Sequence, residues 1–95
     1  MTSESRPRLT LLGRAWCHLC DDMRNALLPL AAKQPFELEV VDVDGDPELE
    51  RRYGEDVPVL FAGATELCRH RLDPVRVAEY LSNYRRIPAP KGQLG

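Results

Sequence analysis

The sequence predicts an α/β fold, a sandwich in which helices cover one mixed four-stranded sheet in the order β-α-β-α-β-β-α. Three observations predict it. The chain of 95 residues is long enough for one compact domain and too short for two. Short apolar or alternating runs, which are typical of strands, are separated by stretches with the spacing of a helical face. A helix between the first two strands allows a parallel crossover, and the last two strands are close enough in sequence for a hairpin.

The first strand and the first helix come from the N-terminal third of the chain. Leu9-Thr10-Leu11-Leu12-Gly13 is a short apolar run that ends at glycine, which indicates a buried strand. Pro29 removes a backbone donor and clashes with the carbonyl of Asn25, so we expect the following helix to kink or restart near residue 28. Pro35 is expected to end it. The apolar face of this helix, with spacings of three and four, consists of Cys20, Met23, Leu27, Leu30 and Ala31.

A second strand and a short helix follow. Residues 36–43 begin as Phe-Glu-Leu-Glu-Val and close on two further valines, a period-two pattern rich in β-branched residues. Asp46 is a candidate N-cap, and Pro47 stands at the first helical position, where a missing N–H costs little. We therefore expect a short helix over residues 48–53, stopped by Gly54.

The C-terminal third predicts a hairpin and a last helix. Val57-Pro58-Val59-Leu60-Phe61 indicates a third strand with proline near its start, where a strand tolerates the missing N–H. Gly63-Ala64 turns the chain into residues 66–71, the expected hairpin partner. Asp73-Pro74 repeats the cap-plus-proline start, and Pro88 is expected to end the helix. The predicted apolar face of this helix consists of Val75, Val77, Ala78, Leu81 and Tyr84.

Both ends of the chain are predicted to be flexible tails. Residues 1–8 are polar, with no apolar side chain to dock after Met1, and residues 88–95 follow the proline that ends the last helix. The domain is therefore expected to span residues 9–87. The sequence contains no internal repeat.

The composition argues against several kinds of partner. A net charge of -2, from 13 basic and 15 acidic residues spread along the chain, provides no positive stripe for phosphates or anionic headgroups. The polar start has no apolar segment behind its charges, and no run of about 18 apolar residues occurs. We therefore expect a cytoplasmic, monomeric protein with neither nucleic acid nor a membrane as its partner.

The cysteines are where chemistry is expected. Three is an odd count, which argues against the paired framework of a secreted domain, so the close pair Cys17 and Cys20 indicates redox chemistry or metal binding. The pair lies between a strand and a helix, which places Cys17 at the positive end of the helix dipole, where the thiolate is favoured. Cys17 is thus the predicted nucleophile. Cys20, one helical turn later, is predicted to resolve a mixed disulfide by intramolecular attack.

Other interpretations of the pair remain open: a metal pair, a structural disulfide or two inert buried thiols. Cys68 and His70 could complete a set of four soft ligands with the pair. Structural zinc sites prefer two short ligand pairs, however, and Cys68 and His70 form only a Cys-x-His pair on a predicted strand. No metal site is therefore predicted, and Cys68 by itself is expected to be a small apolar filler or a half-exposed thiol.

Three neighbours of the pair are candidate substrate-binding residues. A protonated His18 inside the motif could stabilise the Cys17 thiolate, or it could be a solvated surface side chain. Arg14 could lend positive charge to the thiolate or to a substrate carboxylate, with a solvated arginine as the alternative. Trp16, on the loop before Cys17, could shield the site or contact a substrate, with core packing as the alternative.

Two separated segments resemble one family. Residues 15–21, Ala-Trp-Cys-His-Leu-Cys-Asp, resemble the active-site turn of glutaredoxin-like members of the thioredoxin superfamily, and residues 56–61, Asp-Val-Pro-Val-Leu-Phe, resemble their proline-bearing strand. The resemblance spans about residues 9–86 and implies a thioredoxin-like fold. It also implies a Val57–Pro58 bond that is cis and faces the cysteines, so that the Val57 backbone can pair with glutathione or an extended peptide. Val57 and Pro58 are therefore candidate substrate-binding residues.

The sequence departs from typical glutaredoxins in two places. They carry Cys-Pro-Tyr-Cys or Cys-Gly-Phe-Ser at the motif, where this chain has Cys-His-Leu-Cys. They also carry a glycine-containing turn before the last helix that holds the γ-glutamyl end of glutathione, where residues 68–73 are Cys-Arg-His-Arg-Leu-Asp. Asp73 could still meet an amino group. No tightly bound cofactor is expected, and glutathione is a candidate co-substrate.

The predicted function is thiol–disulfide exchange: Cys17 attacks a disulfide, Cys20 resolves it, and an external thiol system reduces the pair again. The expected partner is a disulfide-containing protein or a low-molecular-weight thiol. One alternative is a redox-sensing or protein-binding adaptor without turnover, whose contacts would be Arg51, Arg52 and the rim around Trp16. Another is a small metal-holding protein that uses the three cysteines.

Overall fold

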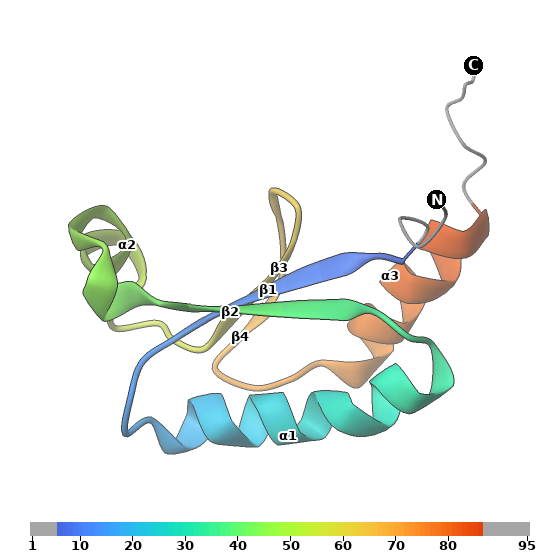
Figure 1. Ribbon diagram of the computed structural model, residues 1–95, viewed down its shortest axis with the longest axis horizontal. Coiled ribbons are helices and arrows are strands. Elements are labelled where there is room, and N and C mark those ends of the chain that lie inside the picture. Colours follow the sequence, from blue (N-terminus) through green and yellow to red (C-terminus); the bar gives the residue numbers. More distant parts are fainter. Residues whose placement is uncertain (1–5, 87–95) are drawn as a thin grey trace.

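The computed structural model of the chain describes residues 6–86, which form one mixed sheet of four strands with helices around it (Figure 1). The strands are β1 (Arg8–Gly13), β2 (Glu37–Asp42), β3 (Val59–Ala62) and β4 (Thr65–Arg69), in the spatial order β2-β1-β3-β4. β1 pairs with β2 in parallel and with β3 antiparallel, and β3 and β4 form an antiparallel hairpin. The predicted element order and the mixed sheet are confirmed.

Three α-helices and one 3-10 turn complete the described part of the chain. α1 (His18–Lys33) runs along the sheet, and α3 (Pro74–Arg86) packs beside it (Figure 1). α2 (Pro47–Tyr53) lies at the end of the sheet where β1 leads into α1, and the turn η2 (Val43–Gly45) joins β2 to α2. The end of the molecule with α2 therefore also carries the start of α1.

Short-range signals set the starts of the last two helices. The Asp46 side chain accepts hydrogen bonds from two backbone N–H groups of α2, at 2.9 and 3.3 Å, and Pro47 occupies the first helical position. Asp73 Oδ1 accepts a hydrogen bond from the Arg76 N–H at 3.1 Å, at the start of α3. These side-chain oxygens satisfy N–H groups that have no partner within the first helical turn.

The first helix was predicted to kink or restart near residue 28, and the restart does not occur. α1 continues from His18 to Lys33 with Pro29 inside it. Both Pro29 and Asn25, whose carbonyl loses its usual donor, lie on the exposed side of the helix. Water can hydrogen-bond a carbonyl oxygen at such a position, so the helix tolerates the proline there.

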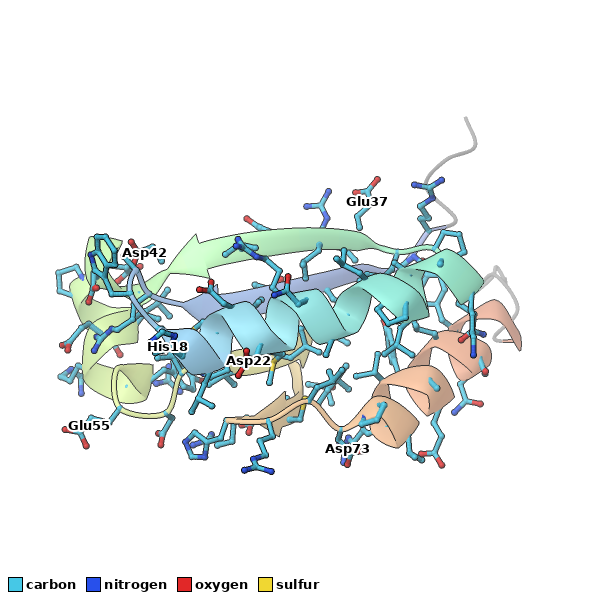
Figure 2. All side chains as sticks on the ribbon, turned by 90° about the horizontal axis from the view of Figure 1, so that it is seen from below. His18, Asp22, Glu37, Asp42, Glu55 and Asp73 are labelled. Atoms are coloured by element: carbon cyan, nitrogen blue, oxygen red, sulfur yellow. A yellow bond between two sulfur atoms is a disulfide. The ribbon has the colours of Figure 1, made fainter. Side chains whose placement is uncertain are left out.

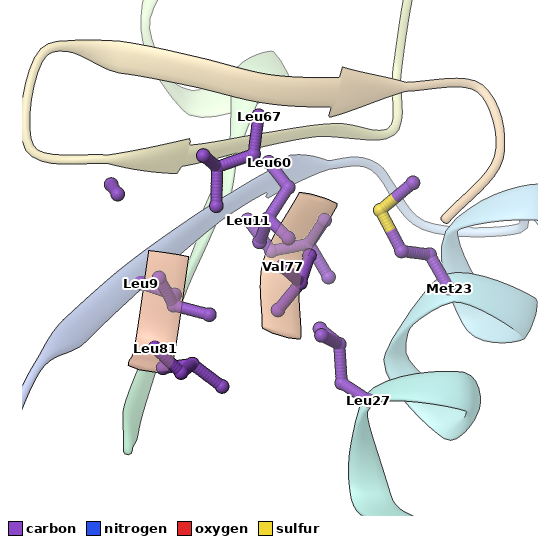
Figure 3. Close-up of a cluster of buried hydrophobic side chains, with 9 residues drawn as sticks. Leu9, Leu11, Met23, Leu27, Leu60, Leu67, Val77 and Leu81 are labelled. Carbon is purple, nitrogen blue, oxygen red and sulfur yellow. The ribbon is translucent and has the colours of Figure 1, made fainter. Parts of the chain in front are cut away.

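The main core lies between the sheet and the two long helices (Figure 3). Burial of one leucine side chain contributes about 1.5–3 kcal/mol, so the leucines of this cluster hold α1 and α3 against the sheet. The buried residues are Leu9 and Leu11 of β1, Leu60 and Ala62 of β3, Leu67 of β4, Met23 and Leu27 of α1, and Val77 and Leu81 of α3.

A second, smaller core lies at the α2 end of the sheet. Alternate residues of a strand face opposite sides, so Leu12 belongs to this cluster although Leu11 belongs to the main core. Partly buried side chains of α2 and β3 close it, with the Tyr53 and Phe61 rings edge to face at 5.7 Å between centroids. The buried members of this second cluster are Leu12, Cys20, Val43, Val57 and Val59.

β3 and β4 are shorter than predicted. β3 begins at Val59, because Pro58 has no N–H to give to the sheet. β4 ends at Arg69, because His70 has a φ of 69°, which lies outside the strand region. β2 likewise ends one residue early, because η2 follows it directly.

The apolar face of α3 is narrower than predicted. Val77 and Leu81 are buried, whereas Val75 is 66% exposed, so its assignment to the buried face was wrong. Two residues along a helix correspond to a rotation of about 200°. Val75 therefore points to the opposite side from Val77.

The predicted tails fall mostly outside the described residues, which exclude 1–5 and 87–95. β1 begins at Arg8, one residue before the expected start, and the Arg8 guanidinium pairs with the Glu37 carboxylate of β2 at 3.4 Å. Within residues 6–86, no helix is long and apolar enough to cross a membrane.

Candidate functional site

Cys17 and Cys20 form a disulfide where the loop after β1 enters α1, and their Cα atoms are 5.2 Å apart. Cys17 is the N-cap of α1 and has extended backbone angles. Its Sγ accepts a hydrogen bond from the Cys20 N–H at 3.1 Å. A sulfur at this position accepts a backbone N–H hydrogen bond and lies at the positive end of a 16-residue helix. This arrangement favours a thiolate after reduction.

The two cysteines differ in burial. Cys20 is only 7% exposed and is a member of the second core cluster, whereas Cys17 packs against that cluster from the rim and is half-buried. Gly13 at the end of β1 makes room for Cys20: a Cβ there would lie 3.3 Å from Cys20 Sγ. Cys17 is therefore the more accessible of the two sulfurs, and Cys20 lies beneath it.

The Val57–Pro58 peptide bond is cis, as the family resemblance implied. Val57 packs in the same cluster as Cys17 and Cys20, which places this bond beside the cysteine pair. Pro58 is fully buried. The Pro58 carbonyl accepts a hydrogen bond from the His70 N–H at 2.8 Å, which fastens this segment to the end of β4.

Asp56, just before this segment, adds a second connection to the end of β4. Its carboxylate lies 3.0 Å from Arg69 Nη1 and 3.6 Å from His70 Nε2. Arg69 also donates two hydrogen bonds to Glu66, at 2.6 and 2.7 Å. Sequence reasoning gave Asp56 no role, although it stands next to Val57 in the motif; its partners could be found only once the hairpin was known.

Trp16 and His18 flank Cys17 on the surface. The Trp16 side chain is fully exposed, and its φ of 62° places it in the left-handed region, which few tryptophans adopt. Core packing, the alternative for Trp16, is therefore excluded. His18 is the first residue of α1 and is exposed at the α2 end of the molecule (Figure 2).

Arg14 is held by acidic side chains of η2 and α2. Its Nη2 lies 2.9 Å from Asp44 Oδ1 and 3.4 Å from Glu50 Oε2, and its side chain is 31% exposed. Its Nε is buried and has no hydrogen-bond partner within the described part of the chain. Gly54 leaves space for this contact, since a Cβ there would lie 2.8 Å from the Glu50 carboxylate. The guanidinium thus ties the loop before Cys17 to α2.

Cys68 lies away from the pair, on β4, where it packs against the main core and is half-buried. Burial raises the pKa of the Cys68 thiol, and a hydrogen bond with the Asp73 backbone offsets part of that effect. No group of three or more His, Cys, Asp or Glu side chains within residues 6–86 is arranged to hold a metal ion.

The turn before α3 differs from the glycine-containing turn of typical glutaredoxins in residues but contains one left-handed position. His70 has the positive φ that glycine adopts most readily. The Asp73 carboxylate caps α3, as described above, and so is already engaged with the backbone.

Two candidate contacts of the adaptor alternative, Arg51 and Arg52, are exposed on α2. Arg51 pairs with Glu48, and the Arg52 guanidinium lies 5.5 Å from the centroid of the Tyr53 ring. Both arginines therefore have local partners on their own helix.

Comparisons with known proteins agree with this geometry. Residues 8–82 match the family model described as Glutaredoxin-like domain (DUF836). The protein Ne2328 from Nitrosomonas europaea, solved by solution NMR, is 43% identical, with a TM-score of 0.73 over 79% of this chain and 91% of that one. The uncharacterized protein Rv0508 of Mycobacterium tuberculosis is 31% identical over 78 residues, which cover 77% of this chain and 80% of the relative.

A more distant structure identifies the fold. Thioredoxin 1 from Thermosipho africanus has a TM-score of 0.57 over 83% of this chain and 94% of its own, at 18% identity. A likeness at that identity speaks for the fold alone. The predicted thioredoxin-like fold is thereby confirmed.

Proposed function

Because the chain belongs to the glutaredoxin-like domain family (DUF836), we propose that it is a thiol–disulfide oxidoreductase working through Cys17 and Cys20. One observation carries the proposal: two cysteines that can join in a disulfide stand at a helix start, one at the rim and one beneath it. A purely structural disulfide would not require this unequal access.

The reduced pair would act in two steps. The Cys17 thiolate attacks one sulfur of a substrate disulfide, a new mixed disulfide forms, and the other substrate sulfur leaves as a thiolate that takes up a proton. Cys20 then gives up its proton, attacks Cys17 Sγ, and expels the second substrate sulfur as a thiol. Two electrons pass from the protein to the substrate, and the Cys17–Cys20 disulfide is left.

An external thiol completes the cycle. Two molecules of a low-molecular-weight thiol, with glutathione as the candidate, or one dithiol would reduce the protein disulfide and be oxidised themselves. We propose a disulfide-containing protein as the substrate, with its extended chain aligned along the Val57 backbone. The contacts from Arg69 and His70 support this role, because they fix the segment that carries Val57.

The direct test is stoichiometric oxidation. Reduced protein, freed of reductant, is mixed with a model disulfide, and the product is followed by intact mass and by release of thiol. We expect formation of the Cys17–Cys20 disulfide, its loss in Cys17→Ser, and a trapped mixed disulfide in Cys20→Ser. Cys68→Ser is the matched control and should behave as the unmodified protein does.

A folded protein whose two thiols resist both the model disulfide and oxidised glutathione would overturn the proposal. Circular dichroism of each variant separates that outcome from loss of the fold. Such an inert pair would instead favour the adaptor, for which the fully exposed Trp16 beside the cysteines is the supporting observation.

A further inference from the structure

A groove of about 310 Å³ opens beside the cysteine pair, between the start of α1 and the edge strand β2. Val57 and Pro58 do not line it, so it is separate from the segment that we propose aligns the substrate backbone. The lining residues that matter here are Trp16, Cys20, Asp21, Arg24, Val40 and Asp42.

The charge around this groove is negative. The Arg14 guanidinium at its wall is already paired with two carboxylates, and Arg24 lies 3.7 Å from the Asp21 carboxylate. Asp42 uses one oxygen to cap η2, by accepting the Asp44 N–H at 2.9 Å. Arg14, Arg24, Asp21 and Asp42 line the groove itself, and Asp44 and Glu50 lie next to it as the partners of Arg14. In and beside the groove, two guanidinium groups therefore stand against four carboxylates.

Trp16 supplies an aromatic side chain at the rim of the groove. Its indole is fully exposed, whereas large aromatic side chains usually bury most of their surface. A cation above an indole face is attracted by the negative charge of the ring face. The same groove therefore offers a positive group both an aromatic face and carboxylates, while an acidic group would meet repulsion.

We propose that this groove receives a lysine or arginine side chain of the protein substrate, adjacent to the half-cystine that reacts with Cys17. The inference rests on the proposed thiol–disulfide exchange, and it adds a class of substrate: protein disulfides flanked by basic residues. The aliphatic stem of the basic residue would lie along Val40 and the indole, and its charged end would reach Asp42.

The expected preference is moderate. An exposed cation–π contact and an exposed ion pair are each worth about a twofold to fivefold gain in affinity. We therefore expect a peptide with basic neighbours to bind about fivefold to tenfold more tightly than its acidic counterpart at low ionic strength. Salt should reduce that ratio, because exposed charges are screened within about 10 Å at 0.1 M salt and about 3 Å at 1 M.

Binding can be measured without any redox chemistry. Two capped peptides differ only in the residues on either side of a serine that replaces the reactive cysteine: lysine in one, glutamate in the other. Trp16 is the only tryptophan of the chain, so its fluorescence in the oxidised protein reports occupancy of this groove. Equal affinity for the two peptides, or tighter binding of the acidic one, would overturn the proposal.

A pair of variants on one strand tests the location. Asp42→Asn removes a charge from the groove and retains a side chain that can cap η2. We expect it to lower the ratio of the affinities for the lysine and glutamate peptides about threefold. Glu39→Gln makes the same change of charge on the opposite face of β2 and should leave the ratio unchanged. An equal effect of both variants would mean that overall charge, not this groove, sets the preference.

Two variants of Trp16 test the contribution of its aromatic ring. Trp16→Phe keeps an aromatic face and Trp16→Leu does not, so binding of the lysine peptide, followed by NMR titration, should weaken more in the leucine variant. If the two variants bound the lysine peptide equally well, Trp16 would have no part in the proposed contact.

The two proposals can fail separately. A protein that binds the lysine peptide but leaves disulfides untouched would retain the groove and lose the oxidoreductase function. A protein that exchanges disulfides but binds both peptides equally would retain the function and lose the groove.

Discussion

The ion pair between Arg14 and Asp44 leads to a prediction about which of its two ends matters more for stability. The Arg14 side chain is 31% exposed, whereas the Asp44 and Glu50 side chains are each about half exposed, at 52% and 53%. Arg14→Met removes the partly buried charge and keeps most of the aliphatic stem. Asp44→Ala removes the carboxylate and leaves the guanidinium in place with only the longer contact to Glu50.

The structure gives the approximate size of each change. A hydrogen bond to a charged group contributes about 1.5–3 kcal/mol, which the exposure of Asp44 reduces to about 1–1.5 kcal/mol. The buried, unpartnered Nε of Arg14 costs about 1 kcal/mol. We therefore expect Arg14→Met to lower the free energy of unfolding by less than about 1 kcal/mol. The loss of the hydrogen bond to Asp44 is nearly offset, because the variant no longer buries an Nε without a partner. Asp44→Ala should lower it by about 1–2 kcal/mol, since the desolvated guanidinium remains.

Urea unfolding of the two single variants and the double variant measures this asymmetry. Once the guanidinium is gone, Asp44 is a solvated carboxylate, so the double variant should match Arg14→Met within about 0.5 kcal/mol. If Arg14→Met cost more than Asp44→Ala, or if the two losses simply added, the assignment of Arg14 as the poorly solvated partner would be wrong.

Three further predictions follow from single contacts. Burial raises the pKa of Cys68, so its alkylation in the oxidised protein should require a higher pH than in urea; equal pH profiles would contradict the packing. The hydrogen bonds from Arg69 hold the pKa of Glu66 below its usual range, so in an NMR titration Arg69→Ala should raise that pKa. Gly54→Ala would place a Cβ 2.5 Å from the Glu50 carbonyl oxygen, and we expect it to lower the free energy of unfolding by about 1–3 kcal/mol in urea. An unchanged midpoint would show that the end of α2 can shift freely.

The parts of the fold that the sequence predicts well are those set by neighbouring residues. Asp46-Pro47 and Asp73-Pro74 mark the starts of α2 and α3 because an N-cap acts on N–H groups two or three residues away. The cysteine pair was found in the same way, since its place between a strand and a helix can be recognised from a few residues on each side.

The features of the fold that the sequence does not predict depend on contacts between segments that are distant along the chain. The partners of Arg14 are 30 and 36 residues away, so no local pattern could distinguish a solvated arginine from one fixed on η2 and α2. The tolerance of Pro29 depended on which side of α1 faced water. The left-handed position at His70 has no glycine to mark it, and the contacts that fix the turn come from Pro58 and Asp56, which are more than ten residues away in the sequence.

The division of the interior into two clusters has a consequence for motion. α2 has no buried residue of its own, and its partly buried side chains close only the smaller cluster. Segments with so little buried surface open locally at a small fraction of the free energy of global unfolding. We therefore expect amide hydrogen exchange to be fast in α2 and slow in β1 and β3. Because Cys20 belongs to the smaller cluster, we expect such opening to give the buried sulfur transient access to solvent while the main core stays intact.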